Sequence, residues 1–260
     1  MNPEEREAEQ LAQDRERIYK FLAAMLSHPD EGKWGRVVCA DEQRLAIQAV
    51  DRLREQTVSR EGGRRSDSLA SQTTTSALDL RYIVLELCQP MEHLKAEHER
   101  VFCETRLDQE ISPLELDHRC IKDPVKKAEF LADLASQYRS FEFDEGNRLP
   151  SRPDHISHEL EFMGWLISRR RIASRVAHLD PTAAGQSSVC DLAQRSFFGN
   201  HLAVWGVTFA KGLQKYTSGG YFEPLGAFLE AWLEREQVVL GPRSRMDERE
   251  GANRRQSVAI

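Results

Sequence analysis

The sequence lacks several features that mark common protein classes. Over its 260 residues, no apolar run reaches the roughly 18 residues of a membrane-spanning helix, so we expect no such span. The N-terminus has no basic stretch followed by an apolar core. We therefore expect no secretory signal and a cytoplasmic location. The five cysteines form no CxxC pair, which argues against a zinc ribbon or a thioredoxin site and favours reduced, mostly buried thiols.

Fingerprints of cofactor-dependent enzymes are also missing. The sequence contains no GxxxxGK[ST] phosphate loop, no GxGxxG, no GxSxG and no HExxH. The net charge is -6, so nucleic acid is not an expected partner. These absences argue against an enzyme that uses a common cofactor, and we expect no catalytic activity and no bound cofactor.

Helical periodicity is present almost everywhere, and no segment shows the alternation of a strand. The first apolar face has the spacing i, i+3, i+4, i+7 and i+8, and consists of Ile18, Phe21, Leu22, Met25 and Leu26. Similar faces predict helices around residues 18–26, 46–53, 80–87, 94–102, 130–138, 154–167, 192–209 and 222–232, the segment 192–209 being bent near Gly199. We predict an all-α fold, a single compact bundle of roughly eight to ten helices.

The composition also predicts the domain organisation. Residues 59–75 are rich in Ser, Thr, Gly and Arg, with almost nothing to bury, which is typical of a flexible loop. Residues 241–260 are polar and are expected to form a disordered tail. We therefore predict one helical domain over residues 1–240 that carries this loop.

The densest polar cluster lies in Pro153–Met163. Asp154 follows a proline at the position expected for a helix N-cap, and His155 and Glu159 then share one helix face. A capped helix with solvated charges, a binding edge and a metal site are all compatible with this pattern. A metal site would need a third and a fourth ligand, which the sequence does not supply.

A second cluster lies in Leu94–Cys103. An apolar stripe that includes His98 is flanked by glutamates, as in an amphipathic core helix. His98 and Cys103 could suggest a cysteine–histidine pair. We set that aside because no third group or oxyanion-hole motif accompanies it.

Four ordered stretches resemble the TorD/DmsD/NarJ family of redox-enzyme maturation chaperones. Arg17–Pro29 is similar to the opening helix of that family, and Leu94–Phe102 is similar to its Leu-x-x-Glu-Tyr-x-x-Leu-Phe helix. Ser112–Glu115 resembles the proline-containing segment that follows. Pro153–Met163 resembles the hinge motif, Pro-Asp-His followed by Glu-Leu-Glu-Phe-Met, and an aromatic pair of C-terminal helices completes the order.

The resemblance implies a chaperone that binds the twin-arginine signal peptide or N-terminus of a molybdopterin oxidoreductase catalytic subunit in its apo form. Such a chaperone would assist cofactor insertion before export. Arginine forks pair best with carboxylates, and an apolar signal helix needs an apolar wall. The residues expected to bind the client are Asp154, His155, Glu159, Glu97, Val101, Phe102, Pro113 and Leu114.

Two alternatives stay open from the sequence. The first is a NarJ-like assembly factor that binds the mature catalytic subunit rather than a signal peptide. The second is a helical metal-dependent hydrolase that uses His155 and Glu159.

Overall fold

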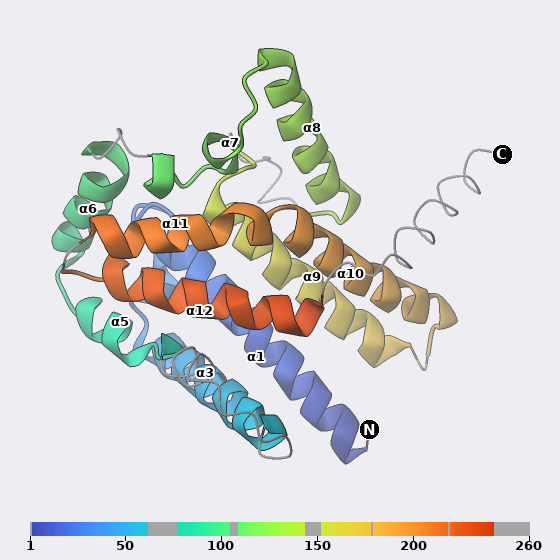
Figure 1. Ribbon diagram of the computed structural model, residues 1–260. Coiled ribbons are helices and arrows are strands. Elements are labelled where there is room, and N and C mark those ends of the chain that lie inside the picture. Colours follow the sequence, from blue (N-terminus) through green and yellow to red (C-terminus); the bar gives the residue numbers. More distant parts are fainter. Residues whose placement is uncertain are drawn as a thin grey trace.

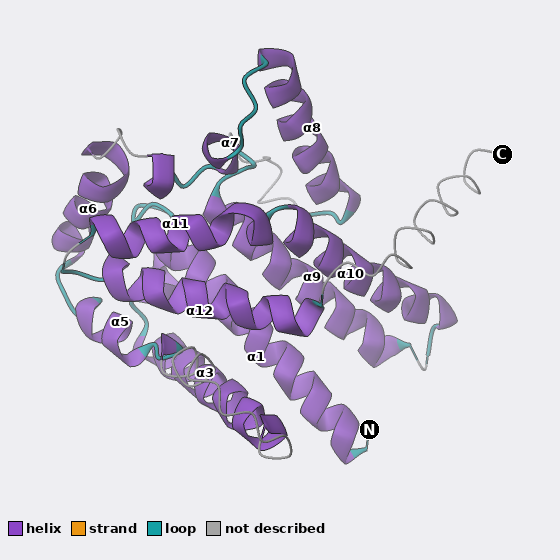
Figure 2. Cartoon of the chain, viewed as in Figure 1, coloured by secondary structure: helices purple, strands orange, loops and turns teal. Residues whose placement is uncertain are grey.

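The fold is built from helices. The computed structural model describes residues 2–61, 77–104, 109–143, 152–177, 179–217 and 219–241. Within these residues the chain forms eleven α-helices and no strand, and Figure 2 shows the loops that join the helices. The predicted all-α bundle is confirmed. No described helix combines the length and the apolar character needed to cross a membrane.

The N-terminal half begins with a capped helix. The Asn2 side chain accepts a hydrogen bond from the Glu5 backbone nitrogen (2.8 Å), and the Glu5 carboxylate accepts one from the Asn2 nitrogen (2.8 Å), which is a capping box. This half contains α1 (Pro3–Met25), α2 (Trp34–Val37), α3 (Ala40–Glu61), α5 (Arg81–Glu86), α6 (Met91–Glu99) and a π-helical turn, η1 (Arg100–Glu104).

In the C-terminal half, aspartates begin two of the long helices. Asp123 and Asp180 each accept a hydrogen bond from a first-turn nitrogen and precede a proline, which is favoured at that position. The elements are η2 (Gln109–Ile111, a 3₁₀ turn), α7 (Glu115–His118), α8 (Pro124–Ser140), α9 (Ile156–Val176), α10 (Pro181–Asn200), α11 (Leu202–Tyr216) and α12 (Phe222–Leu240).

Three helix pairings organise the bundle. Figure 1 shows α1 running antiparallel to α9, with α10 against α9 and with α11 beside α12. α7 and α8 stand above this layer. The core is strongly aromatic; its largest fully buried side chains include Trp34, Trp205, Trp232, Tyr19 and Tyr138.

Buried polar contacts fix α1 against its neighbours. The guanidinium of Arg15 donates to the fully buried carboxylate of Glu236 on α12 (2.6 Å), and the Tyr19 hydroxyl donates to the same carboxylate (3.0 Å). Arg171 of α9 pairs with Glu9 (2.9 Å). Removing one partner of a buried pair leaves an uncompensated charge, so these contacts fix how the helices pack.

Some predictions about the elements were wrong. The structure adds the short helices α2 and α7, which the apolar spacing did not predict. The bend predicted near Gly199 is present as a break between α10 and α11 at His201 (φ -118°, ψ -88°). The helix count therefore exceeds the range predicted. α3 extends to Glu61, so residues 59–61 of the predicted loop are helical; residues 62–76 and 242–260 lie outside the described residues.

The expected burial of the cysteines was also wrong. Of the four cysteines whose side chains are described, Cys39, Cys88 and Cys120 are exposed and only Cys190 is buried. All four are free thiols. Of these four cysteines, only Cys190 therefore contributes to the core.

A glycine in α11 allows η2 to approach. A Cβ at Gly212 would overlap the backbone carbonyl oxygen of Glu110, whereas a Cβ at Gly199 in α10 would meet nothing within 4 Å. The close approach of η2 to α11 fixes the position of the residues that follow η2. These include Pro113 and Leu114, which were predicted to bind the client.

We predict opposite effects for two glycine substitutions. Gly199→Ala should raise the free energy of unfolding by about 0.5–1 kcal/mol, because alanine costs less backbone entropy within a helix. Gly212→Ala should lower it by about 1–3 kcal/mol, because the methyl group pushes against a backbone atom. Urea titrations of both variants measure this. Equal stabilisation of both would contradict the close approach of η2 and α11.

Candidate functional site

Two of the predicted segments cross each other. The Glu115 nitrogen donates to the Asp154 carbonyl oxygen (2.9 Å), and the Ile156 nitrogen donates to the Pro113 carbonyl oxygen (2.8 Å). Leu114 and His155 lie opposite each other in an isolated antiparallel bridge. Leu114 (φ -113°, ψ 123°) and His155 (φ -79°, ψ 135°) both have extended backbones, which allows the two segments to pair at this point. We call Pro113–Leu116 together with Pro153–Ile156 the crossing.

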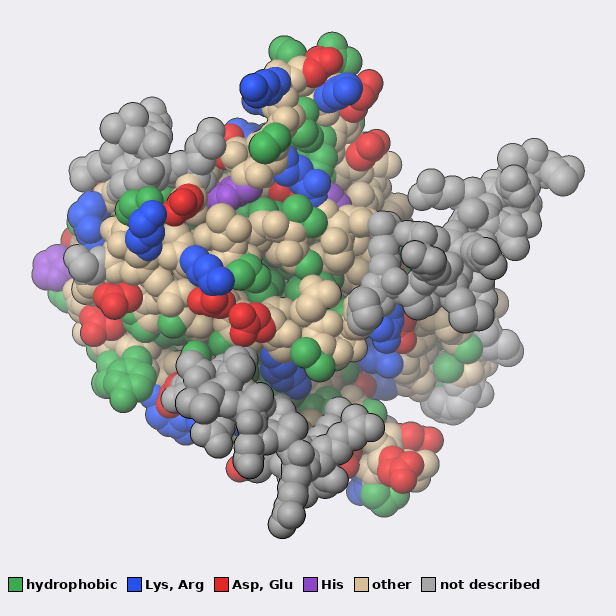
Figure 3. Space-filling model, viewed as in Figure 1, with side chains coloured by type: hydrophobic (Ala, Val, Ile, Leu, Met, Phe, Trp, Pro, Cys, Tyr) green, Lys and Arg blue, Asp and Glu red, His purple; other side chains and the backbone are tan. Residues whose placement is uncertain are grey.

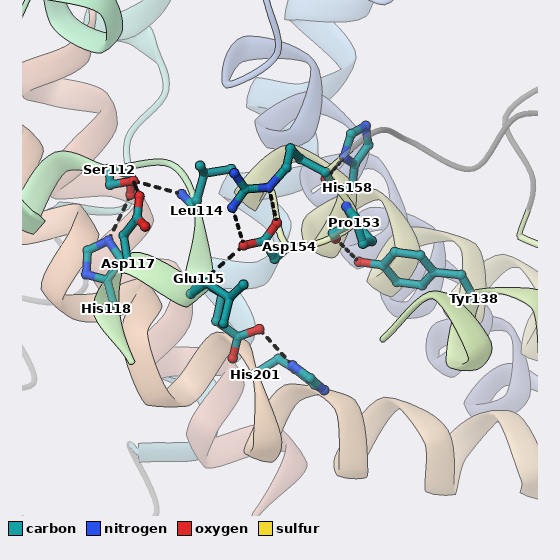
Figure 4. A network of polar contacts seen from close by, with 12 residues as sticks. Ser112, Leu114, Glu115, Asp117, His118, Tyr138, Pro153, Asp154, His158 and His201 are labelled. Atoms are coloured by element: carbon teal, nitrogen blue, oxygen red, sulfur yellow. Dashed lines mark hydrogen bonds and ion pairs between the residues drawn. The ribbon is translucent and has the colours of Figure 1, made fainter. Parts of the chain in front are cut away.

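Asp154 is the centre of the crossing. Its side chain is fully buried, and its two carboxylate oxygens accept hydrogen bonds from Nε and Nη2 of Arg152 (2.9 Å each). The Leu116 nitrogen also donates to Oδ2 (3.3 Å). Figure 4 shows Asp154 beneath the Leu114 segment. The carboxylate therefore joins the start of α7 to the residues before α9.

His155, and not Asp154, is the N-cap of α9. His155 has an extended backbone (φ -79°, ψ 135°), and its Nδ1 accepts a hydrogen bond from the Ser157 nitrogen (3.2 Å). The prediction that Asp154 is the cap was wrong, because either side chain offers a suitable acceptor and Asp154 is held by Arg152 instead.

His155 presents a neutral imidazole. Burial, and to a lesser extent electrostatic interactions with neighbouring basic groups such as Lys33 and Arg152, lower its pKa to about 3. Since Nδ1 accepts, the ring proton lies on Nε2, which makes Nε2 a donor. The side chain is partly exposed, and no hydrogen bond reaches Nε2 from the described part of the chain.

Glu159 points inward. It is fully buried, and its Oε2 accepts a hydrogen bond from Nε1 of Trp205 (3.1 Å). Burial raises its pKa well above the ordinary value, and the negative charge of Glu115 raises it further. The raised pKa favours the protonated form of Glu159, and in that form its carboxyl donates a hydrogen bond to Glu115.

Glu115 is the charged partner. Burial alone would raise its pKa, but the hydrogen bond and the charge of His201 lower it below the ordinary value. His201 Nδ1 lies 2.8 Å from Glu115 Oε2, and Arg119 Nε donates to Oε1 (2.7 Å). These contacts attach α7 to the break between α10 and α11.

The remaining predicted residues lie on α6 and η1 and form a second cluster, which packs against α11 and α12. Glu97 accepts a hydrogen bond from the Phe222 nitrogen at the start of α12 (3.4 Å). Val101 is buried, and the half-buried Phe102 ring packs edge-on against Phe222 (ring centroids 5.1 Å apart). Phe102 also stacks on Phe209 of α11 (ring centroids 6.4 Å apart), and Phe209 packs against His118 of α7 (6.4 Å), so α11 connects this cluster to the residues beside the crossing.

The three predicted carboxylates all have internal roles. Asp154 binds Arg152, Glu159 accepts a hydrogen bond from Trp205, and Glu97 accepts one from the first backbone nitrogen of α12. Sequence reasoning missed Arg152, and it quoted Glu115 only within a motif. An arginine two residues before Asp154 was visible in the sequence, but its pairing was not.

The surface around these clusters is mixed in charge. On the face drawn in Figure 3, acidic and basic side chains are interspersed, and no large area of one sign appears. Any ligand on this face must therefore be selected by local contacts more than by net charge.

Comparison with known proteins identifies the family. A family model described as nitrate reductase delta subunit matches residues 74–211, which is more than half of the chain and includes the whole crossing. The chain belongs to the nitrate reductase delta subunit family. This is the family of NarJ/TorD-type chaperones, so the resemblance seen in the sequence is confirmed. Searches of curated proteins and of solved structures gave no match.

Membership of the delta subunit family sets the general function. The chain is a redox-enzyme maturation chaperone, and the family is not a catalytic one. Within the described residues, no group of three or more His, Cys, Asp and Glu side chains could hold a metal ion. His155 and Glu159 point to different partners, Ser157 and Trp205, which gives the hydrolase alternative no support.

We predict that Glu159→Gln and Glu115→Gln differ sharply. Glutamine mimics a protonated acid, so Glu159→Gln should change the free energy of unfolding near pH 4.5, where wild-type Glu159 keeps its proton, by less than about 1 kcal/mol. Glu115→Gln removes the charged partner of His201 and Arg119, and should cost about 3 kcal/mol or more. Urea titration of both variants measures this. Equal losses would mean that Glu159 is ionised.

The same pair predicts a pH dependence. The raised pKa of Glu159 means that the folded state keeps a proton which the unfolded state loses near its ordinary value of 4.5. Stability of the wild type should therefore fall relative to Glu159→Gln as pH rises above that value, by about 1.4 kcal/mol per pH unit until the folded pKa is reached. A difference that does not vary between pH 5 and pH 8 would contradict this.

Proposed function

We propose that the chain is a cytoplasmic, system-specific chaperone for one molybdopterin-containing oxidoreductase. It binds the twin-arginine signal peptide or N-terminal segment of the apo catalytic subunit, and it assists cofactor insertion and folding before export. The observation that carries the proposal is the family match over residues 74–211. It spans every residue that the sequence resemblance assigns to client binding.

The crossing offers chemistry that suits a peptide. His155 offers a neutral N–H donor for a backbone carbonyl, and the half-buried Pro113 and Leu114 lie beside it. Phe102 adds a half-buried aromatic ring from the neighbouring cluster. An apolar helix of the client that docks here would place its apolar face on these side chains.

The alternative is binding of the mature catalytic subunit. Affinity purification of the tagged chain from its native host, followed by mass spectrometry, tests the proposal. We expect a molybdopterin oxidoreductase catalytic subunit in the eluate. Deleting the N-terminal segment of that subunit should then abolish capture, whereas retained capture would favour the alternative. Recovery of no molybdopterin enzyme would contradict both.

We predict that His155→Asn separates capping from client binding. Asparagine caps a helix well, so the melting temperature should stay near that of the wild type. Loss of the imidazole donor should weaken binding of the client segment about two- to tenfold, as expected for one neutral hydrogen bond.

Calorimetric titration of the client segment measures this effect. The exposed His93 on α6 supplies the matched control, and His93→Asn should bind as the wild type does. Equal affinity of His155→Asn and the wild type would place the peptide away from the crossing.

A further inference from the structure

The contact between Arg152 and Asp154 has the geometry of guanidinium recognition. Two parallel hydrogen bonds of 2.9 Å join Nε and Nη2 of Arg152 to Oδ1 and Oδ2 of Asp154. Such a fork fits the planar guanidinium group and not an ammonium group. The Leu116 nitrogen donates to Oδ2 (3.3 Å) and so helps to fix the plane of the carboxylate.

The two partners differ in burial. The Asp154 side chain is 0% exposed, whereas the Arg152 side chain is 43% exposed. The carboxylate is thus built into the crossing, and the guanidinium covers it from the solvent side. The hydrogen bond and the charge of Asp154 raise the pKa of Arg152, against the effect of burial, and the charge of Asp117 adds to them. Two acidic groups therefore act on one guanidinium.

The main chain at Arg152 is held independently of its side chain. Its backbone carbonyl accepts a hydrogen bond from His158 Nδ1 (3.1 Å), which holds the main chain. Rotation of its side-chain torsions alone would uncover Asp154. The apolar Pro113 and Leu114 would then lie within the same crossing as a vacant carboxylate.

We propose that Asp154 is a guanidinium-binding site that Arg152 occupies in the free protein, and that an arginine side chain of a bound peptide takes its place. The identity of the peptide rests on the proposed function, but the guanidinium site does not. Arg152 is then an internal competitor.

Competition of this kind gives selectivity. A group tethered two residues away has a high effective concentration, so the site is rarely free, and the apparent affinity of a guest falls in proportion. A lone arginine in solution is excluded. A peptide that also contacts Leu114 and His155 gains enough to displace Arg152.

Arg152→Ala tests the site with methylguanidinium chloride as the probe. Ethylammonium chloride at equal ionic strength serves as the reference salt. Methylguanidinium should raise the melting temperature of Arg152→Ala above its value in ethylammonium, because it restores the lost partner of a buried carboxylate. The wild type and the double variant Arg152→Ala/Asp154→Asn should show no such difference.

Two further variants complete the design. Arg169→Ala removes an arginine from an exposed pair with Glu142, and methylguanidinium should give it no specific protection. Arg152→Lys keeps a positive charge but cannot form the two parallel hydrogen bonds. It replaces Arg152→Ala in the experiment if that variant does not fold. Methylguanidinium should protect Arg152→Lys as well.

A peptide experiment measures the competition. A blocked peptide with one arginine among leucines should bind Arg152→Ala, or Arg152→Lys, about tenfold or more tightly than it binds the wild type. Replacing its arginine by lysine should remove that gain. Protection by methylguanidinium that is no greater in the Arg152 variants than in the double variant would overturn the proposal, whether or not a molybdopterin enzyme is the client. Weaker peptide binding by the Arg152 variants than by the wild type would overturn the proposed exchange of Arg152 for an arginine of the peptide.

Discussion

The buried carboxylate of Asp154 is the contact on which the organisation of the site depends. It accepts hydrogen bonds from Arg152 on one side and from the Leu116 nitrogen on the other, and it thereby holds two segments that are far apart in the sequence. Glu115 then sits where it can bind His201, at the break between α10 and α11. Burial, and then the charge on Glu115, raise the pKa of Glu159 and so favour its protonated form. One carboxylate therefore sets the position of four elements.

The acidic groups that were predicted to bind the client already have partners within the fold, and this changes how the client is expected to be recognised. Carboxylates suggest binding of arginine, yet Asp154, Glu159 and Glu97 each have a partner within the chain. A buried carboxylate that lost its partner would cost several kcal/mol. Recognition is thus expected to proceed through the neutral donor of His155, through apolar contacts, and through exchange of one guanidinium for another. Each of these keeps every buried group satisfied while the peptide arrives.

The sequence predicted the helices better than the site. Apolar faces such as that of Phe222, Leu225 and Leu229 indicate a buried helix from spacing alone, and the structure has them buried in α12. The site depends on pairs that spacing cannot reveal. Leu116 and Asp154 are 38 residues apart, and Glu115 gains its importance only from His201. Asp154 and His155 are both suitable caps, and Asp154 is instead held by Arg152, a local side-chain pairing that the spacing of apolar residues does not reveal.

Hydrogen exchange at the crossing tests the central claim most directly. The amide hydrogens of Glu115 and Ile156 donate across the crossing, so they should exchange at similar rates, through one opening event. Addition of the client segment should slow both, and Asp154→Asn should speed both. Two amides that exchange independently, or that do not respond to the client segment, would contradict the account of the crossing as a single unit that binds it.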